Sequence, residues 1–174
     1  MKRIAALTFV FSLPITTIAA ENDMTITSPA FDEGQPIPVE YSCKGPDISP
    51  ALEWSGAPEG TVSFALICDD PDAPVGTWVH WVYFNIPSGL SGLPAAVQGG
   101  EKPETGGTQG RNSWRKNAYG GPCPPSGTHR YFFKLYALDM ILDLDPSANK
   151  SALLKAMEGH VLAEAQLIGT FSRR

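Results

Sequence analysis

The sequence predicts a mainly β protein, an antiparallel β-sandwich with a short C-terminal helical segment. Two observations indicate this fold class. Sixteen prolines and seventeen glycines are spread along the chain and interrupt almost every helical pattern before about residue 145. Between them lie short runs rich in β-branched and aromatic residues, a pattern typical of strands joined by irregular loops.

Three segments have the clearest strand pattern, and four shorter ones are weaker candidates. The clear segments are Ser63–Asp69, Val79–Ile86 and His129–Asp139. The weaker ones are Thr25–Ser28, Pro38–Tyr41, Leu52–Trp54 and Leu167–Phe171. The stretch from 88 to 116 has no strong period, so we expect it to form loops.

One helix is expected near the C-terminus, over Asn149–Met157. Apolar residues recur there at helical spacing, after a polar start and before a glycine. A second helical turn is expected through Val161–Ala163.

The first twenty residues have the organisation of an export signal. Met1-Lys2-Arg3 is a short cationic start, an apolar run follows, and Ala19 and Ala20 supply the small residues of a cleavage site. The apolar run, about ten residues long, is too short to span a bilayer. We therefore expect cleavage, leaving residues 21–174 as one domain that is periplasmic or secreted.

The exported part is acidic. Without Lys2 and Arg3, 11 basic residues remain against 18 acidic ones, a formal charge of −7. Long-range repulsion then disfavours charge-driven binding of nucleic acid or of an anionic membrane surface. Local binding of one small anion is compatible with this charge.

Three cysteines allow at most one internal disulfide. Cys68 ends an apolar run and is expected in a buried strand, whereas Cys43 and Cys123 lie in loops rich in Gly, Pro and Ser. A Cys43–Cys123 bridge is therefore predicted.

The polar residues of the clear strands lie where apolar faces begin or end. Because side chains two apart share a face of a strand, Asp70 ends one such face, and His80 begins a face that continues with Val82. Antiparallel pairing of these two strands is expected to set Asp70 opposite His80. On the third strand, His129 and Tyr131 together open an apolar face.

These side chains suit a small anion such as phosphate or a carboxylate. Two imidazoles, a tyrosine hydroxyl and the backbone of proline- and glycine-rich loops can supply hydrogen-bond donors. Asp70 is expected to orient a histidine and favour its protonation, since a carboxylate repels an anion unless it is protonated. Asp72 is a further candidate at the site, with bracing of its loop as the alternative.

Three segments resemble the signature segments of the phosphatidylethanolamine-binding protein family. They are Asp70-Pro71-Asp72-Ala73-Pro74, Trp78-Val79-His80-Trp81 and Gly127-Thr128-His129-Arg130-Tyr131. Further landmarks resemble the bacterial branch of that family, often called Raf kinase inhibitor-like proteins: Asp47-Ile48-Ser49-Pro50, Tyr119-Gly120-Gly121-Pro122-Cys123-Pro124-Pro125 and Met157-Glu158-Gly159-His160-Val161-Leu162-Ala163.

The resemblance implies an antiparallel β-sandwich with a small cavity that takes phosphate-like or carboxylate groups. It places Asp70, His80, His129 and Tyr131 in that cavity. With the loop residues added, the candidate ligand-binding residues are Asp70, Asp72, Pro74, His80, Gly121, Cys123, His129 and Tyr131. One local departure is Asn112-Ser113-Trp114, where members of the family commonly carry an Asp-Phe pair.

The leading functional hypothesis is a module that binds a small anion, either free or as the head of a phospholipid or of a phosphorylated or carboxylate-ended peptide. Inhibition of a kinase or a protease would be one form of it. One alternative is a metal-dependent enzyme that uses Asp70, His80 and His129, the ligand set of non-haem iron enzymes. Another is a weak hydrolase, although no Gly-x-Ser-x-Gly motif is present.

No catalytic motif and no cofactor motif is apparent, so binding is expected rather than catalysis. The sequence leaves the protein partner and the oligomeric state open, a homodimer included.

Overall fold

The computed structural model describes residues 24–173. One group of strands comprises β3 (Ser63–Asp70), β4 (Trp78–Pro87), β6 (Thr108–Gln109), β7 (Thr128–Leu138) and β8 (Val161–Ser172). The other comprises β1 (Thr25–Thr27), β2 (Leu52–Ser55) and β5 (Gly92–Leu93). The helices are the 3-10 helix η1 (Val39–Tyr41) and the α-helix α1 (Lys150–Met157).

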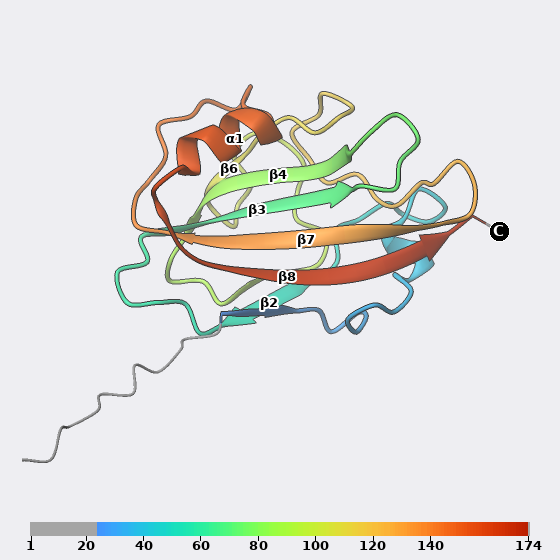
Figure 1. Cartoon of the computed structure of the whole chain (residues 1–174), viewed down its shortest axis with the longest axis horizontal. Helices are drawn as coiled ribbons and strands as arrows, with labels where there is room; N and C mark the ends of the chain where they lie inside the picture. Colours follow the sequence, from blue (N-terminus) through green and yellow to red (C-terminus); the bar gives the residue numbers. More distant parts are fainter. Residues whose placement is uncertain (1–23, 174) are drawn as a thin grey trace, which may run out of the picture.

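The strands form two antiparallel sheets, which confirms the predicted fold class. The larger sheet has the order β6-β4-β3-β7-β8, and the smaller has the order β1-β2-β5. Figure 1 shows β3, β4, β7 and β8 side by side, with α1 near one end of the sheet. The predicted export signal, residues 1–20, lies outside the described residues.

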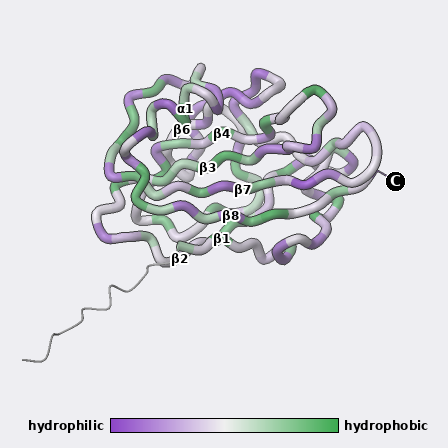
Figure 2. Tube along the Cα trace, in the orientation of Figure 1, coloured by the Kyte–Doolittle hydropathy of each residue, from purple (hydrophilic) through white to green (hydrophobic). Residues whose placement is uncertain are grey.

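Two hydrophobic cores lie on opposite faces of the larger sheet. The core between the two sheets includes Leu52, Trp54, Phe64, Leu66, Tyr131, Phe133 and Leu135. The core that includes α1 contains Ala65, Ile67, Val82, Phe84, Leu153 and Met157. Because β3 is buried on both faces, its central residues 64–68 form an unbroken apolar run, whereas hydrophilic and hydrophobic stretches alternate along β7 (Figure 2).

The predicted C-terminal helix is confirmed as α1. The Oδ1 atom of Asn149 accepts a hydrogen bond of 3.1 Å from the backbone N–H of Ala152, so Asn149 caps the helix. Within residues 24–173, no helix is long and apolar enough to cross a membrane.

The helical turn predicted at Val161–Ala163 is wrong, because these residues begin β8. Val161 pairs with Leu138, and Ala163 pairs with Ala137 of β7. A register of backbone hydrogen bonds along almost the whole of β7 outweighs the weak local preference for a helix. The predicted strand Leu167–Phe171 is therefore the C-terminal part of a longer strand.

The strand predicted at Pro38–Tyr41 is also wrong, because the segment forms η1. The backbone N–H of Tyr41 donates to the carbonyl oxygen of Pro38, and that of Ser42 to the carbonyl oxygen of Val39, each over 3.1 Å. Proline has no N–H to donate to a strand ladder, so a turn satisfies this segment better. The expected loop from 88 to 116 contains only the two short strands β5 and β6.

The β3–β4 hairpin departs from the predicted register. Asp70 pairs with Trp78 and not with His80, because two β-bulges, one between Phe64 and Leu66 and one between Cys68 and Asp69, each shift the register by one residue. On β4, Val79 and Trp81 pair with consecutive β3 residues, so His80 between them has no partner on β3. A bulge of this kind changes the direction in which the extra residue points.

The bulge brings His80 to the sandwich side of the sheet. Its ring packs edge-on against Tyr131, with the two ring centroids 5.1 Å apart. Val82, by contrast, belongs to the core under α1. The prediction that His80 and Val82 share a face is therefore wrong. The bulge between them and β3 is what brings His80 into contact with Tyr131 of β7.

Candidate functional site

A cavity of about 280 Å³ lies where β3 ends and β4 begins. Its lining residues are Asp70, Ala73, Pro74, Val75, Trp78, His80, Trp114, Cys123 and Pro125. Four predicted site residues are among them: Asp70, Pro74, His80 and Cys123. The other four predicted residues contact this set without lining the cavity wall: Asp72, Gly121, His129 and Tyr131.

His80 is held in one orientation by the backbone of a distant loop. Its Nδ1 atom lies 2.6 Å from the carbonyl oxygen of Gly120. Because a carbonyl oxygen only accepts, Nδ1 carries the hydrogen, and Nε2 of the neutral ring is an acceptor. Burial lowers the pKa of His80, although the Gly120 carbonyl and the charge of Asp70 act in the opposite direction. The ring is therefore neutral at pH 7 and becomes a double donor only on protonation.

Asp70 positions His129. Its Oδ2 atom lies 2.7 Å from Nδ1 of His129, and its Oδ1 atom accepts a hydrogen bond of 2.8 Å from the backbone N–H of Asp72. The carboxylate accepts, so Nδ1 of His129 carries a hydrogen and Nε2 is the ring nitrogen left for another partner. Both side chains are nearly buried. The arrangement matches the orienting role expected of Asp70.

Tyr131 carries a buried hydroxyl at the inner side of the site. The residue is fully buried, and among residues 24–173 its hydroxyl oxygen has no hydrogen-bond partner. Burial raises the pKa of Tyr131 and the charge of Asp70 raises it further, while the nearby backbone N–H of Cys123 acts in the opposite direction. The net effect is a raised pKa, so the hydroxyl keeps its hydrogen. An unsatisfied buried polar group costs about 1–3 kcal/mol. A ligand oxygen or a water molecule beside it would remove that cost.

Asp72 braces the rim of the cavity. Its carboxylate accepts hydrogen bonds from the backbone N–H, the Nε and the Nη2 of Arg130, over 3.0, 2.9 and 2.7 Å. These bonds lower the pKa of Asp72 to about 2. The ion pair joins the β3–β4 loop to β7 and so supports the contact between Asp70 and His129.

The predicted disulfide is present and closes the opposite wall of the cavity. Cys43 and Cys123 are bonded, with their Cα atoms 5.5 Å apart, and Cys123 lines the cavity. The backbone N–H of Cys43 also donates to the carbonyl oxygen of Pro122 over 3.2 Å. Cys68 is a buried free thiol, as expected.

Gly121 marks a close contact between the same two loops. Its backbone N–H donates a hydrogen bond of 2.6 Å to Oδ1 of Asp47. A Cβ atom at this position would lie 2.2 Å from the carbonyl oxygen of Tyr41, so only glycine fits. Because its N–H is already bonded, Gly121 fixes the loop behind the wall and holds the Gly120 carbonyl that orients His80.

Two tryptophans that sequence reasoning did not assign to the site form an aromatic wall. The ring of Trp114 packs edge-on against Trp78 at 5.3 Å and against His80 at 5.1 Å between centroids. Trp78 lies two residues before His80, so the period of a strand could have identified it. Trp114 comes from a remote loop, and only the departure from the family pattern at Asn112-Ser113-Trp114 pointed to it. The backbone carbonyl of Gly120 had no such signal.

The described part of the chain offers no metal centre. Among residues 24–173, no group of three or more His, Cys, Asp or Glu side chains is arranged to hold a metal ion. The set considered for a metal-dependent enzyme, Asp70, His80 and His129, therefore does not converge as metal ligands.

The fold and the site define a two-sheet β-sandwich with a histidine- and carboxylate-lined cavity at one end of its larger sheet. The family model for phosphatidylethanolamine-binding proteins matches residues 27–172. The chain thus belongs to the phosphatidylethanolamine-binding protein family.

Individual relatives support this assignment. A UPF0098 protein from Methanothermobacter thermautotrophicus is 53% identical, over 86% of this chain and 99% of the relative. A UPF0098 protein from Aquifex aeolicus is 46% identical, over 86% of this chain and 89% of the relative.

Two solved structures are similar to the whole sandwich. A phosphatidylethanolamine-binding protein homolog from Chlamydia trachomatis has a TM-score of 0.81 at 40% identity and covers 88% of this chain and 99% of its own. Escherichia coli YbcL, described as a new member of the mammalian family, has a TM-score of 0.81 at 32% identity and covers 87% of this chain and 99% of its own.

Proposed function

We propose that the cavity binds a small anionic group, a phosphate or a carboxylate, and that the protein is an exported binding protein and not an enzyme. The observation that carries the proposal is the buried Tyr131 hydroxyl, which has no partner among residues 24–173 and lies on the ring that packs against His80. Because this hydroxyl keeps its hydrogen, it can donate a hydrogen bond to an oxygen of the bound anion.

Proton uptake is expected to accompany binding. The Asp70 carboxylate lines the cavity and repels a fully ionised anion. A protonated His80 offsets that repulsion and donates from Nε2, and an anion bound beside it raises the pKa of the ring. Because burial lowers the pKa of His80 in the folded protein, affinity should rise as the pH falls through the histidine range, near the reference value of about 6.5.

The aromatic wall favours an anion that carries an organic part. Trp78, Trp114 and Val75 line the cavity, and Val75 is 78% exposed at its mouth. A phospholipid headgroup and a phosphorylated or carboxylate-ended peptide both combine an anion with such a part. Membership of a family with phospholipid-like ligands favours the first, and inhibition of a kinase or protease would follow from the second.

Titration calorimetry with inorganic phosphate at pH 5.5 and pH 7.5 tests the proposal. Tyr131→Phe removes a hydroxyl that has no hydrogen-bond partner within the described part of the chain, so it should leave stability unchanged or higher. It should lower phosphate affinity about tenfold, the value of one charge-assisted hydrogen bond. His129→Ala should also weaken binding. His160→Ala is the matched control, since that histidine is exposed and bonded to Asp139.

Equal phosphate affinity in the wild type, Tyr131→Phe and His129→Ala would overturn the assignment of the site. Affinity that rises with pH would overturn the coupling to protonation.

Export needs a separate measurement. The intact mass of the protein recovered from the periplasm or the medium should correspond to a chain that begins at Ala20 or Glu21. A mass that retains Met1 would contradict the predicted cleavage.

A further inference from the structure

Asn112 has a buried side chain beside the cavity and is only 5% exposed. Its amide uses all four of its hydrogen-bonding positions. The Oδ1 atom accepts bonds of 3.0 Å from the backbone N–H groups of Trp114 and Lys116. The Nδ2 group donates to the carbonyl oxygen of Ala118 over 2.9 Å and to that of His80 over 3.4 Å. One amide therefore joins a strand residue of the cavity to the loop that faces it.

The loop from 112 to 120 supplies two of the groups that surround His80. The Trp114 ring lies against the His80 ring, with centroids 5.1 Å apart, and the Gly120 carbonyl oxygen accepts the hydrogen of its Nδ1 atom. A Cβ atom on Gly120 would lie 2.7 Å from the Trp114 ring, so these two groups are also in close contact with each other. The positions of Trp114 and Gly120 are therefore coupled.

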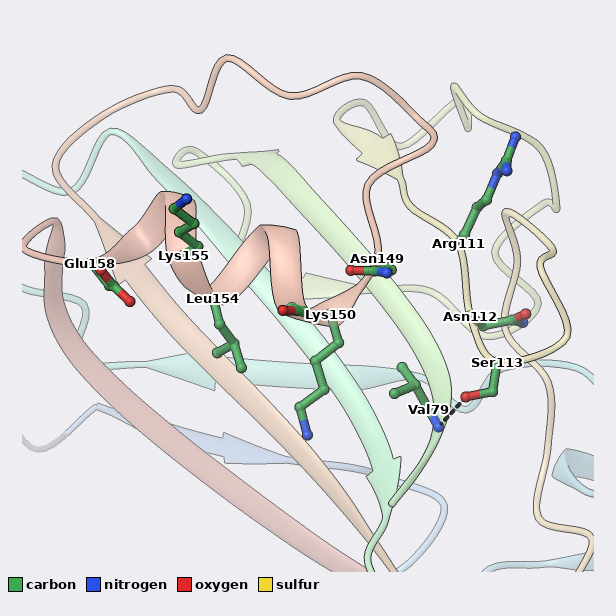
Figure 3. Close-up of a pocket in the computed structure, with 10 residues that line it drawn as sticks. Val79, Arg111, Asn112, Ser113, Asn149, Lys150, Leu154, Lys155 and Glu158 are labelled. Atoms are coloured by element: carbon green, nitrogen blue, oxygen red, sulfur yellow. Dashed lines mark hydrogen bonds between the residues drawn. The ribbon is translucent and has the colours of Figure 1, made fainter. Parts of the chain in front are cut away.

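The start of this loop is fixed to β4 beside the cavity. The N–H of Ser113 donates to the carbonyl oxygen of Val79, and its hydroxyl oxygen accepts from the Val79 N–H, each over 2.9 Å. Figure 3 shows the second of these bonds and shows the Asn112 side chain directed away from α1. Asn112 thus points into its own loop from an end that β4 holds in place.

The turn that Asn112 closes is strained. Arg115 has a φ of 61°, in the left-handed region that residues other than glycine rarely adopt. Its backbone N–H donates to the carbonyl oxygen of Asn112 over 2.9 Å. Strain of this kind persists only where surrounding contacts enforce it. The bonds of Asn112 to Trp114, Arg115 and Lys116 are such contacts.

The Trp114 ring is 40% exposed, so packing covers only part of it. Its edge-on contacts with Trp78 and His80 then depend on where the backbone places the ring. The backbone N–H of Trp114 is the group that bonds to Oδ1 of Asn112. The aromatic wall therefore takes its position from Asn112.

We propose that Asn112 is the positioning residue of the cavity: its amide holds the Trp114 ring against His80, and the preference of the cavity for anions with an organic part depends on it. The inference rests on the proposed function and deepens it, since it names the group that sets ligand selectivity. An amide suits this place because its Nδ2 group donates to two carbonyl oxygens, which a carboxylate cannot do.

The first test needs no ligand. The pKa of His80 is measured by NMR in phosphate-free buffer, from the chemical shifts of its ring protons. Burial lowers this pKa, and the Trp114 ring covers part of the imidazole, so Asn112→Ala should raise it toward the reference value of about 6.5. Trp114→Ala should raise it as well, and the double variant should raise it no further than Trp114→Ala alone.

Asn117→Ala is the matched control. Asn117 lies in the same loop, and its Nδ2 group also donates to two carbonyl oxygens, those of Gln109 and Pro146. These partners lie outside the set of residues that lines the cavity. The control should therefore leave the pKa of His80 unchanged.

The second test compares the affinities for phenyl phosphate and methyl phosphate, two esters of equal charge. The wild type should bind phenyl phosphate about fivefold more tightly, the size of one aromatic contact. Asn112→Asp keeps the shape of the side chain but loses both donor bonds, so it should abolish this preference. Because the two esters carry the same charge, the ratio of their affinities is insensitive to the added carboxylate. This variant tests the proposal even where Asn112→Ala fails to fold.

The positioning role would be overturned by a His80 pKa that Asn112→Ala leaves unchanged or that Asn117→Ala raises equally. A preference for phenyl phosphate that survives in Asn112→Asp, or that is absent from the wild type, would overturn the role in selectivity. If neither ester binds to the wild type, the proposed function fails, while the pKa of His80 still decides whether Asn112 positions the wall.

Discussion

The Nδ1 atom of His80 donates a hydrogen bond of 2.6 Å to the carbonyl oxygen of Gly120, forty residues further along the chain. This contact joins the bulge in β4 to the loop that the Cys43–Cys123 disulfide holds in place. The ring orientation at the cavity thus depends on two loops as well as on a strand.

The first prediction concerns pH and stability. Burial lowers the pKa of His80 in the folded protein, so below about pH 6.5 the unfolded chain binds more protons than the folded one. The free energy of unfolding should therefore fall as the pH drops from about 6.5 toward the lowered pKa. Urea unfolding in a phosphate-free buffer should show this loss in the wild type and a smaller loss in His80→Gln. If the free energy of unfolding fell with pH equally in the wild type and in His80→Gln, the prediction would be contradicted. His160→Gln serves as the control.

The second prediction concerns Gly121. Gly121→Ala should lower the free energy of unfolding by about 2 kcal/mol, because its methyl group would collide with the carbonyl oxygen of Tyr41. The displaced loop should also weaken phosphate binding. Gly89→Ala is the control, since nothing lies within 4 Å of a Cβ atom there. Similar denaturant midpoints for the two variants would show that the loop contact is looser than described.

The third prediction concerns the disulfide, which links residues 80 positions apart. Its removal in a Cys43→Ser/Cys123→Ser variant should lower the free energy of unfolding by roughly 4 kcal/mol in the chain-entropy model. After mild reduction of the wild type, a thiol reagent should label Cys43 and Cys123, which are exposed. Cys68 should react only on unfolding, because burial raises its pKa and blocks access. Labelling of Cys68 in the folded protein would be inconsistent with the structure.

The fourth prediction concerns the rim ion pair. The pKa of Asp72 lies at about 2 in the folded protein, mainly because of its hydrogen bonds from Arg130. The stabilisation that the charged Asp72 carboxylate gives the folded protein is therefore fully present above its pKa in the unfolded chain, about 4. It is lost as the pH falls through its pKa in the folded protein, about 2. Asp72→Asn should be less stable than the wild type at pH 6, with the difference shrinking between pH 4 and pH 2. Asp143→Asn is the control, and a difference independent of pH would refute the role of the carboxylate charge.

Much of the fold could be predicted because its signals are local. The predicted bounds of the three clear strands agree with the structure to within one residue at every end, since apolar runs between prolines and glycines specify them. The two wrong elements, Pro38–Tyr41 and Val161–Ala163, are short segments in which distant partners or missing N–H groups outweigh a weak preference.

The site was predictable in part for the same reason. Strand alternation placed Asp70 at one end of an apolar face and put His129 with Tyr131, and both groupings hold in the structure. The cysteine pairing followed from loop composition and is present. Resemblance to the family supplied the link between the strands that alternation alone did not establish.

The sequence by itself determined the family, the sandwich and the identity of the polar groups, because short-range patterns and motifs encode them. Only the tertiary structure decided how those groups meet. The bulge that turns His80 toward Tyr131, the Gly120 carbonyl that orients it and the wall formed by Trp114 all arise between segments far apart in the chain. Such contacts depend on register and loop packing, which no local pattern specifies.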